Sequence, residues 1–253
     1  DAAAEVCPTG EEPLPETEAA PEAPAQEVEK TENVGGDGVL DFGTILPETG
    51  DLAFLGPPEF AGVDLAVQDI NEAGGVNDAN VTVSHGDSGD TSTDLASTES
   101  ARLIAAGVDA IIGAASSGVS LNVIDQITGA GVIQFSPANT SPTFTDYDDG
   151  GLYFRTAPSD VLQGRVLADL VAADGFTTAA VLARDDDYGV NLKDSFEGYF
   201  TEAGGTVAVS EAYDPQAQNF DAEVDAVVGA EPDAIIIIGF DETAQIITGL
   251  QEA

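Results

Sequence analysis

The sequence predicts an α/β fold built on parallel, doubly wound sheets, and two features support that prediction. Short apolar runs of strand length alternate along the chain with longer segments whose apolar residues recur at helical spacing. The runs are almost entirely apolar, as in Val108–Ile112, which is typical of strands buried on both faces of a parallel sheet. We therefore expect strands and helices to alternate as they do in doubly wound folds.

Residues 38–156 are predicted to form an N-terminal lobe. The segment Glu59–Glu72 has Phe60 and further apolar residues at helical spacing, and Gly74 and Gly75 end that helix. Val132–Phe135 is expected to be a second strand buried on both faces. The predicted strands are Val39–Leu46, Asn80–His85, Val108–Ile112, Val132–Phe135 and Leu152–Thr156, and the predicted helices are Glu59–Glu72, Thr93–Ala106 and one that begins at Ser116 and Ser117.

Residues 157–253 are predicted to form a C-terminal lobe, with the crossover near Pro158. In the helix Asp160–Ala173 we expect Val161, Leu162, Val166, Leu167 and Leu170 to face inward. About three strands are expected, fewer than the five or so typical of a sheet, so this lobe is predicted to be truncated at its C-terminal end. Its predicted strands are Thr178–Ala183, Val207–Ser210 and Ala234–Ile238, and its other predicted helices are Asp187–Ala203, Phe220–Val228 and one that begins at Asp241.

The charge balance excludes some classes of partner. The chain has 47 acidic and 6 basic residues, a net charge of −41. Nucleic acid is excluded as a partner because phosphate binding needs clustered Lys and Arg. We interpret the charge as a heavily hydrated surface of the kind found in salt-adapted proteins.

Residues 1–37 are predicted to be a disordered acidic tail rich in Pro, Glu and Ala, because they contain too few apolar residues to offset the entropy of ordering. The sequence contains no methionine, so we expect that an upstream segment has been removed. The residues before Cys7 lack the small-residue signature of a lipoprotein cleavage site. A removed upstream signal, with or without a lipidated cysteine, is therefore expected rather than an anchor at Cys7.

Two polar turns are predicted to meet at one edge of the first sheet. Ser116 and Ser117 follow a buried strand at the start of a helix, and the turn Ser136–Thr140 follows the next strand. The carboxyl ends of neighbouring parallel strands lie at the same edge, where α/β proteins bind ligands. Hydroxyl groups and free helix N–H groups gathered at one point suit a small anion such as a carboxylate, although serines at such positions also serve as helix caps.

Five stretches carry a family resemblance, and they occur in the family's order. They are PPEFAGVDLAVQDINEAGGVN, IIGAASSGVS, GVIQFSPANTSPTFT, YFRTAPSD and ARDDDYGVNL. Together they resemble the type I periplasmic binding proteins of the leucine/isoleucine/valine kind, the substrate-binding subunits of branched-chain amino acid ABC transporters. The resemblance covers roughly residues 38–253 and implies two Rossmann-like lobes joined by a hinge. It further implies an extracytoplasmic binding protein, periplasmic or at the cell surface, that closes over an amino acid or related small polar solute and delivers it to an ABC permease, without a cofactor.

The resemblance also assigns residues in the N-terminal lobe. The family's carboxylate-binding serine falls on Ser117, beside Ser116. The turn Ala138, Asn139 and Thr140 falls where the family provides a backbone carbonyl and a threonine to the ligand. A serine hydroxyl and the Thr140 N–H can donate to a carboxylate, and the Ala138 carbonyl and Thr140 hydroxyl can accept from an ammonium group.

In the C-terminal lobe, the resemblance places Tyr188 over the ligand and Phe240 in the wall of the side-chain pocket. Asp241 is either a ligand contact or the cap of the last helix, and local sequence favours the cap. Arg155 matches a hinge-region arginine and is expected to pair with a structural carboxylate. The family's acid for the ligand ammonium would lie beyond Ala253.

Two rival functions remain open from the sequence. The first is a sensory ligand-binding module of the same fold. The second is an enzyme that uses an Asp cluster around Asp87 or Asp185 with a metal, but Asp87–Asp90 with Asp94 lacks the spacing and closing Glu of a calcium loop. His85 is the sole histidine, so no nucleophile–His–acid set is expected. We therefore expect neither a metal site nor enzymatic activity.

Overall fold

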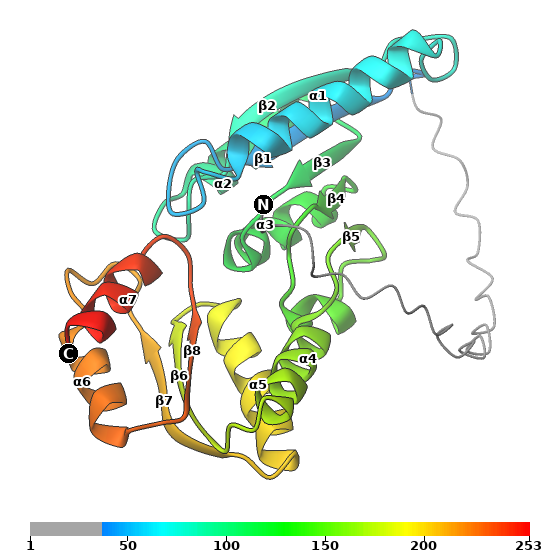
Figure 1. Ribbon diagram of the computed structural model, residues 1–253. Coiled ribbons are helices and arrows are strands. Elements are labelled where there is room, and N and C mark those ends of the chain that lie inside the picture. The colour runs from blue at the N-terminus through cyan, green and yellow to red at the C-terminus, as the bar shows by residue number, and fades with distance from the viewer. Residues whose placement is uncertain (1–36) are drawn as a thin grey trace, which may run out of the picture. The chain divides into compact units, whose positions relative to one another are not determined.

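Parallel strand pairing organises residues 37–253, the part of the chain that the computed structural model describes. All paired strands of the two sheets in this range are parallel, which confirms the predicted α/β class (Figure 1). Residues 1–36, which include Cys7 and all of the predicted tail except Asp37, lie outside the described residues. The first sheet has the spatial order β2 (Thr82–Asp87), β1 (Asp41–Leu46), β3 (Ala110–Gly113), β4 (Ile133–Ser136) and β5 (Tyr153–Arg155), and the second has the order β7 (Thr206–Tyr213), β6 (Thr178–Arg184) and β8 (Ala234–Ile238).

Helices follow the strands as the sequence predicted, with small shifts at their ends. Helix α1 begins at Gly56 rather than Glu59, because Pro57 and Pro58 fall in its first turn, where the missing N–H of proline does no harm. A short 3-10 helix, η1, was not predicted. The helices are α1 (Gly56–Glu72), α2 (Leu95–Ala106), α3 (Ser117–Gly129), η1 (Pro142–Asp146), α4 (Asp160–Ala173), α5 (Gly189–Glu202), α6 (Asp221–Ala230) and α7 (Thr243–Glu252).

Each sheet has its own apolar core. Helices α2 and α3 pack on the first sheet around the fully buried Leu103, Ile111 and Val123. The second sheet is covered on both faces, as a parallel sheet requires. Phe196 and Phe200 of α5 pack with α4 on one face, and residues of α6 and α7 pack with Tyr213 on the other.

The inward face predicted for α4 is wrong, although its bounds are correct. Four of the five residues expected to face inward are 44–57% exposed, namely Val161, Leu162, Val166 and Leu170. Small residues face α5 instead: Ala168 is fully buried, and a Cβ on Gly164 would lie 2.6 Å from the Cβ of Ser195. Close approach of the two helices therefore selects the small residues for the interface and leaves the large ones outside.

Strand β4 is also less buried than its sequence predicted. Ile133 and Phe135 are each 37% exposed, whereas Gln134 and Ser136 are fully buried. Each of these side chains donates a hydrogen bond, Gln134 to the Gly113 carbonyl at 3.2 Å and Ser136 to the Ala114 carbonyl at 2.7 Å. One face of the first sheet at β4 and β5 is thus left open to solvent, and there Phe135 stacks on Phe154.

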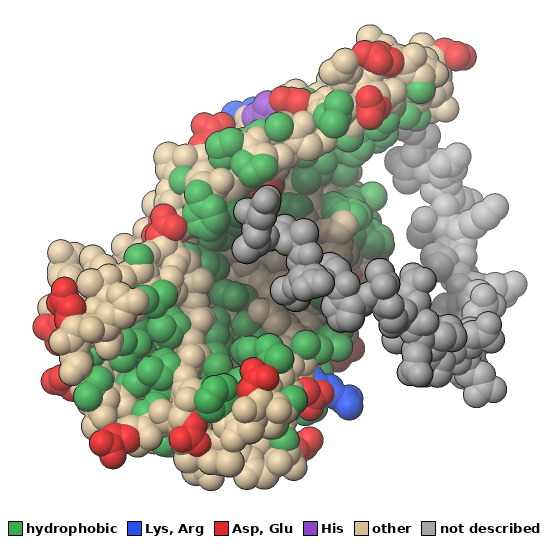
Figure 2. Space-filling view, viewed as in Figure 1, with side chains coloured by type: hydrophobic (Ala, Val, Ile, Leu, Met, Phe, Trp, Pro, Cys, Tyr) green, Lys and Arg blue, Asp and Glu red, His purple; other side chains and the backbone are tan. Residues whose placement is uncertain are grey.

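An apolar cavity of about 400 Å³ separates α1 from β1 and β3. Apolar side chains gather on this face of the molecule, below α1 in the view of Figure 2. Glu59 lines the cavity with one carboxylate oxygen that has no hydrogen-bond partner among the described residues. Burial raises the pKa of this side chain to about 7. Among residues 37–253, no helix combines the length and the apolar character needed to cross a membrane.

We predict that Phe196→Ala lowers the free energy of unfolding by roughly 3–5 kcal/mol, because the fully buried ring would leave a cavity between α5 and the second sheet. Phe176→Ala is the matched control, since Phe176 is 41% exposed and its truncation should cost much less. Urea unfolding monitored by circular dichroism measures both. Equal losses in the two variants would contradict this assignment of the core.

Candidate ligand-binding site

The order of the strands in each sheet indicates where the candidate site lies. In the first sheet, the order β2–β1–β3–β4–β5 reverses direction between β1 and β3, and in the second, β7–β6–β8 reverses at β6. Ligands of open α/β sheets bind beyond the carboxyl ends of strands at such a reversal. Loops that follow β1, β3, β4, β6 and β8 contribute to one cavity of about 240 Å³. Its lining is Leu52, Phe54, Leu55, Ala115, Ser116, Ser117, Ala138, Thr140, Gln163, Tyr188 and Phe240.

The serine-rich turn begins helix α3 as predicted. Ser116 is the N-cap residue, with extended backbone angles, and Ser117 is the first helical residue. The Ser116 side chain makes no capping bond within the described range, so it does not act as the cap that local sequence alone favours. Ser117 is 3% exposed, and its hydroxyl oxygen accepts from the N–H groups of Thr140 and Ser141, each at 3.3 Å. The two predicted turns are therefore in direct contact.

The turn after β4 divides into lining and supporting residues. Ala138 and Thr140 line the cavity. Asn139, predicted as a ligand contact, is instead fully buried behind the lining. Its amide donates to the carbonyls of Ala114 and Ala115 at 3.1 and 2.8 Å, and its oxygen accepts from the Tyr153 hydroxyl at 2.8 Å. Asn139 thus fixes the turn after β3 rather than lining the cavity.

Tyr188 and Phe240 come from the loops after β6 and β8 and form an aromatic wall. Their rings stack with centroids 5.4 Å apart and planes 11° from parallel. Burial, with the nearby carboxylates of Asp160 and Asp186, raises the pKa of the Tyr188 phenol. Asp241 is not part of the lining, and it is not the cap of α7 either, because the N-cap residue is Glu242. Glu242 accepts from the Phe240 N–H with both carboxylate oxygens, at 3.2 Å each, and so folds back onto the strand end.

Sequence reasoning missed the apolar part of the lining that follows β1. Leu52, Phe54 and Leu55 lie in the loop before α1, and Phe54 is 57% exposed. Their signal in the sequence was an apolar cluster inside a loop rich in Gly and Pro, where it could not belong to a strand. Together with the aromatic wall, they form the apolar part of the cavity lining.

Asp160 was missed as a candidate because it reads as an ordinary residue of a helix start. It is fully buried, and neither carboxylate oxygen has a partner in hydrogen-bond geometry in the described part of the chain. Its N–H donates to the Thr140 carbonyl at 2.8 Å, which holds it directly behind the cavity lining. Burial raises the pKa of Asp160 to about 6, against the opposing effects of the Thr140 hydroxyl and the Arg155 guanidinium. Such a group favours a cation placed beside it.

In the described part of the chain Arg155 has no carboxylate partner, which differs from the prediction. Its guanidinium donates to the Ser141 carbonyl at 2.7 Å, to the Asn139 carbonyl at 3.4 Å and to the Thr145 hydroxyl at 3.2 Å. The arginine therefore satisfies the carbonyl groups of the turn that carries Thr140. Its charge reaches Asp160 from behind this turn and holds down part of the rise in the pKa of that carboxyl.

The acidic loop at Asp87 has a structural role. The Asp87 carboxylate accepts from the N–H groups of Glu48, Thr49 and Gly89 and from the Thr49 hydroxyl. Partial burial alone would raise the pKa of Asp87, but these hydrogen bonds outweigh it and lower the pKa. No set of three or more His, Cys, Asp or Glu residues within 37–253 is arranged to hold a metal ion.

Comparison with known proteins supplies a family. A family model described as periplasmic binding protein matches residues 40–253. Leu/Ile/Val-binding protein homolog 3 of Brucella melitensis is 26% identical over 203 residues, covering 79% of this chain and 54% of the relative. Homolog 2 of Brucella abortus is 30% identical over 193 residues, covering 75% and 51%. The chain spans about half the length of the curated relatives that it matches.

Solved structures are similar in fold. The leucine-binding protein LivK of Thermotoga maritima superposes with a TM-score of 0.76 at 28% identity, covering 84% of this chain and 60% of that one. LivJ of Streptococcus pneumoniae, solved with isoleucine, gives 0.75 at 25% identity, covering 85% and 61%. A solute-binding protein of R. palustris, solved with 4-hydroxybenzoate, gives 0.75 at 18% identity over 85% and 59%, a likeness of fold alone.

We predict that Asp160→Asn removes part of the pH dependence of the free energy of unfolding. Burial raises the pKa of this carboxyl from 3.8 to about 6, so the folded state holds the proton more tightly than the unfolded chain. The free energy of unfolding should then fall as the pH rises through this window, by about 3 kcal/mol in total. Asp160→Asn should therefore be more stable than the wild type at pH 7 and nearly equal to it below pH 4.

Urea unfolding at fixed high salt measures this difference. It is repeated at several pH values between about 3.5 and about 7.5, a range that spans the ordinary and the raised pKa of a carboxyl group. Glu59→Gln is the comparison variant, because the pKa of Glu59 rises from 4.5 to about 7 and its window lies higher. A wild-type–variant difference that does not change with pH would refute the burial of an unpartnered Asp160.

Proposed function

We propose that this chain, which belongs to the periplasmic binding protein family, is the solute-binding component of an ABC importer and binds a branched-chain amino acid. The main observation is a cavity at the carboxyl ends of both sheets whose lining has a polar part, from the turns that carry Ser117 and Thr140, and an apolar part, from Leu52, Phe54, Leu55, Tyr188 and Phe240. Relatives named as Leu/Ile/Val-binding proteins and a neighbour solved with isoleucine support the ligand class. Family membership supports a binding protein that works outside the cytoplasm rather than an enzyme.

The polar end suits the main-chain groups of an amino acid. In our proposal, the Ser117 hydroxyl and the free N–H groups of the first turn of α3 receive the carboxylate, because a helix N-terminus favours an anion. The Thr140 N–H, which donates to the Ser117 hydroxyl oxygen at 3.3 Å, can also donate to the carboxylate. The Ala138 carbonyl and Thr140 hydroxyl accept from the ammonium group.

Asp160 supplies the negative charge that the ammonium group needs. It lies directly behind Thr140, buried and unpartnered among the described residues, so a cation bound at Thr140 would stabilise its ionised form. The polar end would then offer one carboxylate to one ammonium group and helix N–H groups to one carboxylate. This balance suits a zwitterion better than an anion alone.

The apolar end suits a branched aliphatic side chain. Leu52, Phe54 and Leu55 line the same cavity as the aromatic wall of Tyr188 and Phe240. A volume of about 240 Å³ lies below the range of roughly 300–1,000 Å³ common for drug-sized ligands, so it fits a small solute. Closure of the two sheet regions over the ligand would bury that side chain and stabilise the closed state. An ABC permease is the partner that follows from this function.

We predict that the full chain binds leucine, isoleucine or valine and that Ser117→Ala and Thr140→Ala each weaken binding by about tenfold, the loss of one charge-assisted hydrogen bond. Isothermal titration calorimetry in high salt measures the affinities. Ser97→Ala is the matched control, because its exposed hydroxyl bonds to Gln126 away from the cavity. The absence of binding to every amino acid tested, by a protein that unfolds cooperatively, would refute the amino acid assignment.

We further predict that amino acid affinity falls as the pH drops below about 6, the pKa of Asp160 without ligand. Protonation removes the charge that the ammonium group needs, and one linked proton changes affinity by up to about tenfold per pH unit. Asp160→Asn should bind amino acids weakly at about pH 7.5, where Asp160 of the wild type is ionised, and its affinity should change little with pH. Titrations at several pH values test this, and an unchanged wild-type affinity well below pH 6 would exclude Asp160 from ammonium binding.

A further inference from the structure

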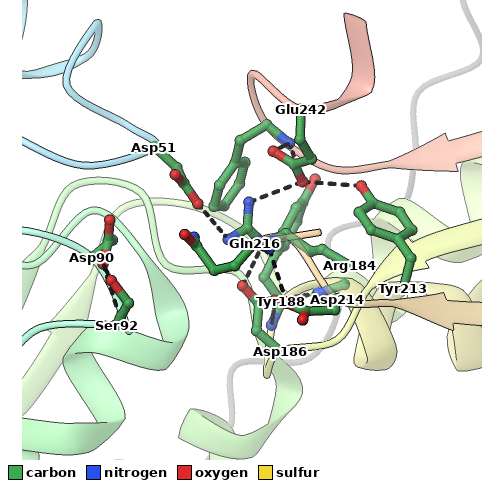
Figure 3. A network of polar contacts seen from close by, with 12 residues as sticks. Asp51, Asp90, Ser92, Arg184, Asp186, Tyr188, Tyr213, Asp214, Gln216 and Glu242 are labelled. Atoms are coloured by element: carbon green, nitrogen blue, oxygen red, sulfur yellow. Dashed lines mark hydrogen bonds and ion pairs between the residues drawn. The ribbon is translucent and has the colours of Figure 1, made fainter. Parts of the chain in front are cut away.

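Arg184 lies at the centre of a charged cluster behind the cavity. It is the last residue of β6, and its side chain is 2% exposed. Its guanidinium pairs with Asp51 at 3.1 Å, with Asp186 at 2.6 Å and with Glu242 at 3.1 Å. These carboxylates come from the loop after β1, the loop after β6 and the turn before α7 (Figure 3).

Each partner of Arg184 in the second sheet region holds one residue of the aromatic wall. The Asp186 carboxylate accepts from the Tyr188 N–H at 3.0 Å, and the Glu242 carboxylate accepts from the Phe240 N–H. The guanidinium also lies 3.7 Å from the centre of the Phe240 ring, which stacks in turn on Tyr188. Arg184 thus fixes both rings of the wall without lining the cavity itself.

The third partner belongs to the opposite side of the cavity. Asp51 precedes Leu52, the first apolar lining residue of the loop after β1. Among the ion pairs of residues 37–253, Arg184–Asp51 alone joins the first sheet region to the second. The pair therefore connects the Leu52 loop to the strand end that carries the aromatic wall, next to residues that line the cavity.

The three ion pairs differ in how easily they separate. The side chains of Asp186 and Glu242 are 7% and 9% exposed, so parting them from Arg184 would leave a buried charge unpaired. Asp51 is 25% exposed and lies on a loop, so water can solvate its carboxylate when the pair opens. Arg184 would keep two carboxylates in that open state. The pairs of Arg184 with Asp186 and Glu242 are thus expected to persist, whereas its pair with Asp51 can open.

We propose that Arg184 is a positioning residue for the ligand pocket and that its pair with Asp51 couples closure of the two sheet regions to docking of the Leu52 loop against the aromatic wall. This inference rests on the proposed function, because it requires a ligand whose side chain touches that wall. Since Arg184 keeps Tyr188 and Phe240 in place in either state, the formation of one ion pair brings the Leu52 loop against a wall already formed. A ligand that fills the gap and the pair that spans it then stabilise the same closed state.

The test is calorimetric titration of the full chain with leucine and with alanine, comparing wild type, Asp51→Asn and Asp51→Glu. Asp51→Asn should weaken leucine binding by about tenfold, equivalent to ~1.4 kcal/mol. It should weaken alanine binding much less, because alanine barely reaches the apolar wall. Asp51→Glu should restore most of the leucine affinity. Glu48→Gln, which removes one exposed charge from the same loop, is the control and should leave both affinities unchanged.

Arg184→Lys gives an independent readout, because lysine keeps the charge but cannot stack flat on Phe240 or bridge three carboxylates. It should also lower the leucine-to-alanine affinity ratio, in a protein whose circular dichroism confirms folding. An unchanged ratio in both Asp51→Asn and Arg184→Lys, with wild type binding leucine, would overturn this inference and leave the proposed function standing. A wild type that binds no amino acid would overturn both.

Discussion

Parallel strand pairing is the constraint on which the candidate site depends. Because every strand of a sheet runs the same way, the loops after β1, β3 and β4 must emerge at one edge, whatever their sequences. The register of β1 with β3 brings Ile45 level with Gly113, so the two loops leave the sheet side by side. Gly113 is required at this point, since a Cβ there would lie 2.1 Å from the Ile45 carbonyl oxygen. The approach of the two strand ends thus sets where Ser117 and the Leu52 loop can meet.

Electrostatics then divide the site into two unlike parts. Acidic side chains are spread over the face shown in Figure 2 and basic ones are few, as the net charge of −41 requires. One of the six cations is nevertheless buried at Arg184 and surrounded by three carboxylates, so its charge is fully compensated. Asp160 is buried without an ion pair among the described residues, and the Arg155 charge offsets only part of the rise in its pKa. In an acidic protein, a buried carboxylate without an ion pair is the feature that a cationic ligand group can satisfy.

The sequence predicted elements better than it predicted faces. Periodicity and Gly placement gave the bounds of α4 and β8 correctly, because those signals are local. The inward face of α4 was wrong because Gly164 and Ala168 are chosen by α5, which packs from a distant part of the chain. For β4, hydrogen bonds to Gln134 and Ser136 allowed polar residues inside and left Phe135 outside. Packing between elements, rather than propensity, decided each of these cases.

The candidate site was predictable where the residue type carries the chemistry. Ser117 and Thr140 were found from hydroxyl groups at strand ends, and the structure brings them into contact. Asn139 sits between lining residues, but its amide is consumed by the carbonyls of Ala114 and Ala115. Asp160 and Asp51 were missed because their importance arises from burial and from a partner 133 residues away. Neither the burial of a side chain nor a partner that is distant in the chain can be predicted from a local stretch of sequence.

The distribution of the lining over the two sheets has a consequence for ligand selection. Ser117, Ala138 and Thr140 all follow strands of the first sheet, so these three groups proposed for the ligand main chain are assembled before any closure, whereas Asp160 begins α4. The apolar end requires Leu52 from one sheet region and Tyr188 with Phe240 from the other, so it exists only when the two meet. Recognition of an amino acid as such would then precede recognition of its side chain. Selectivity among amino acids is accordingly expected to reside in the closed state, where the side chain must fill the gap that Arg184 and Asp51 span.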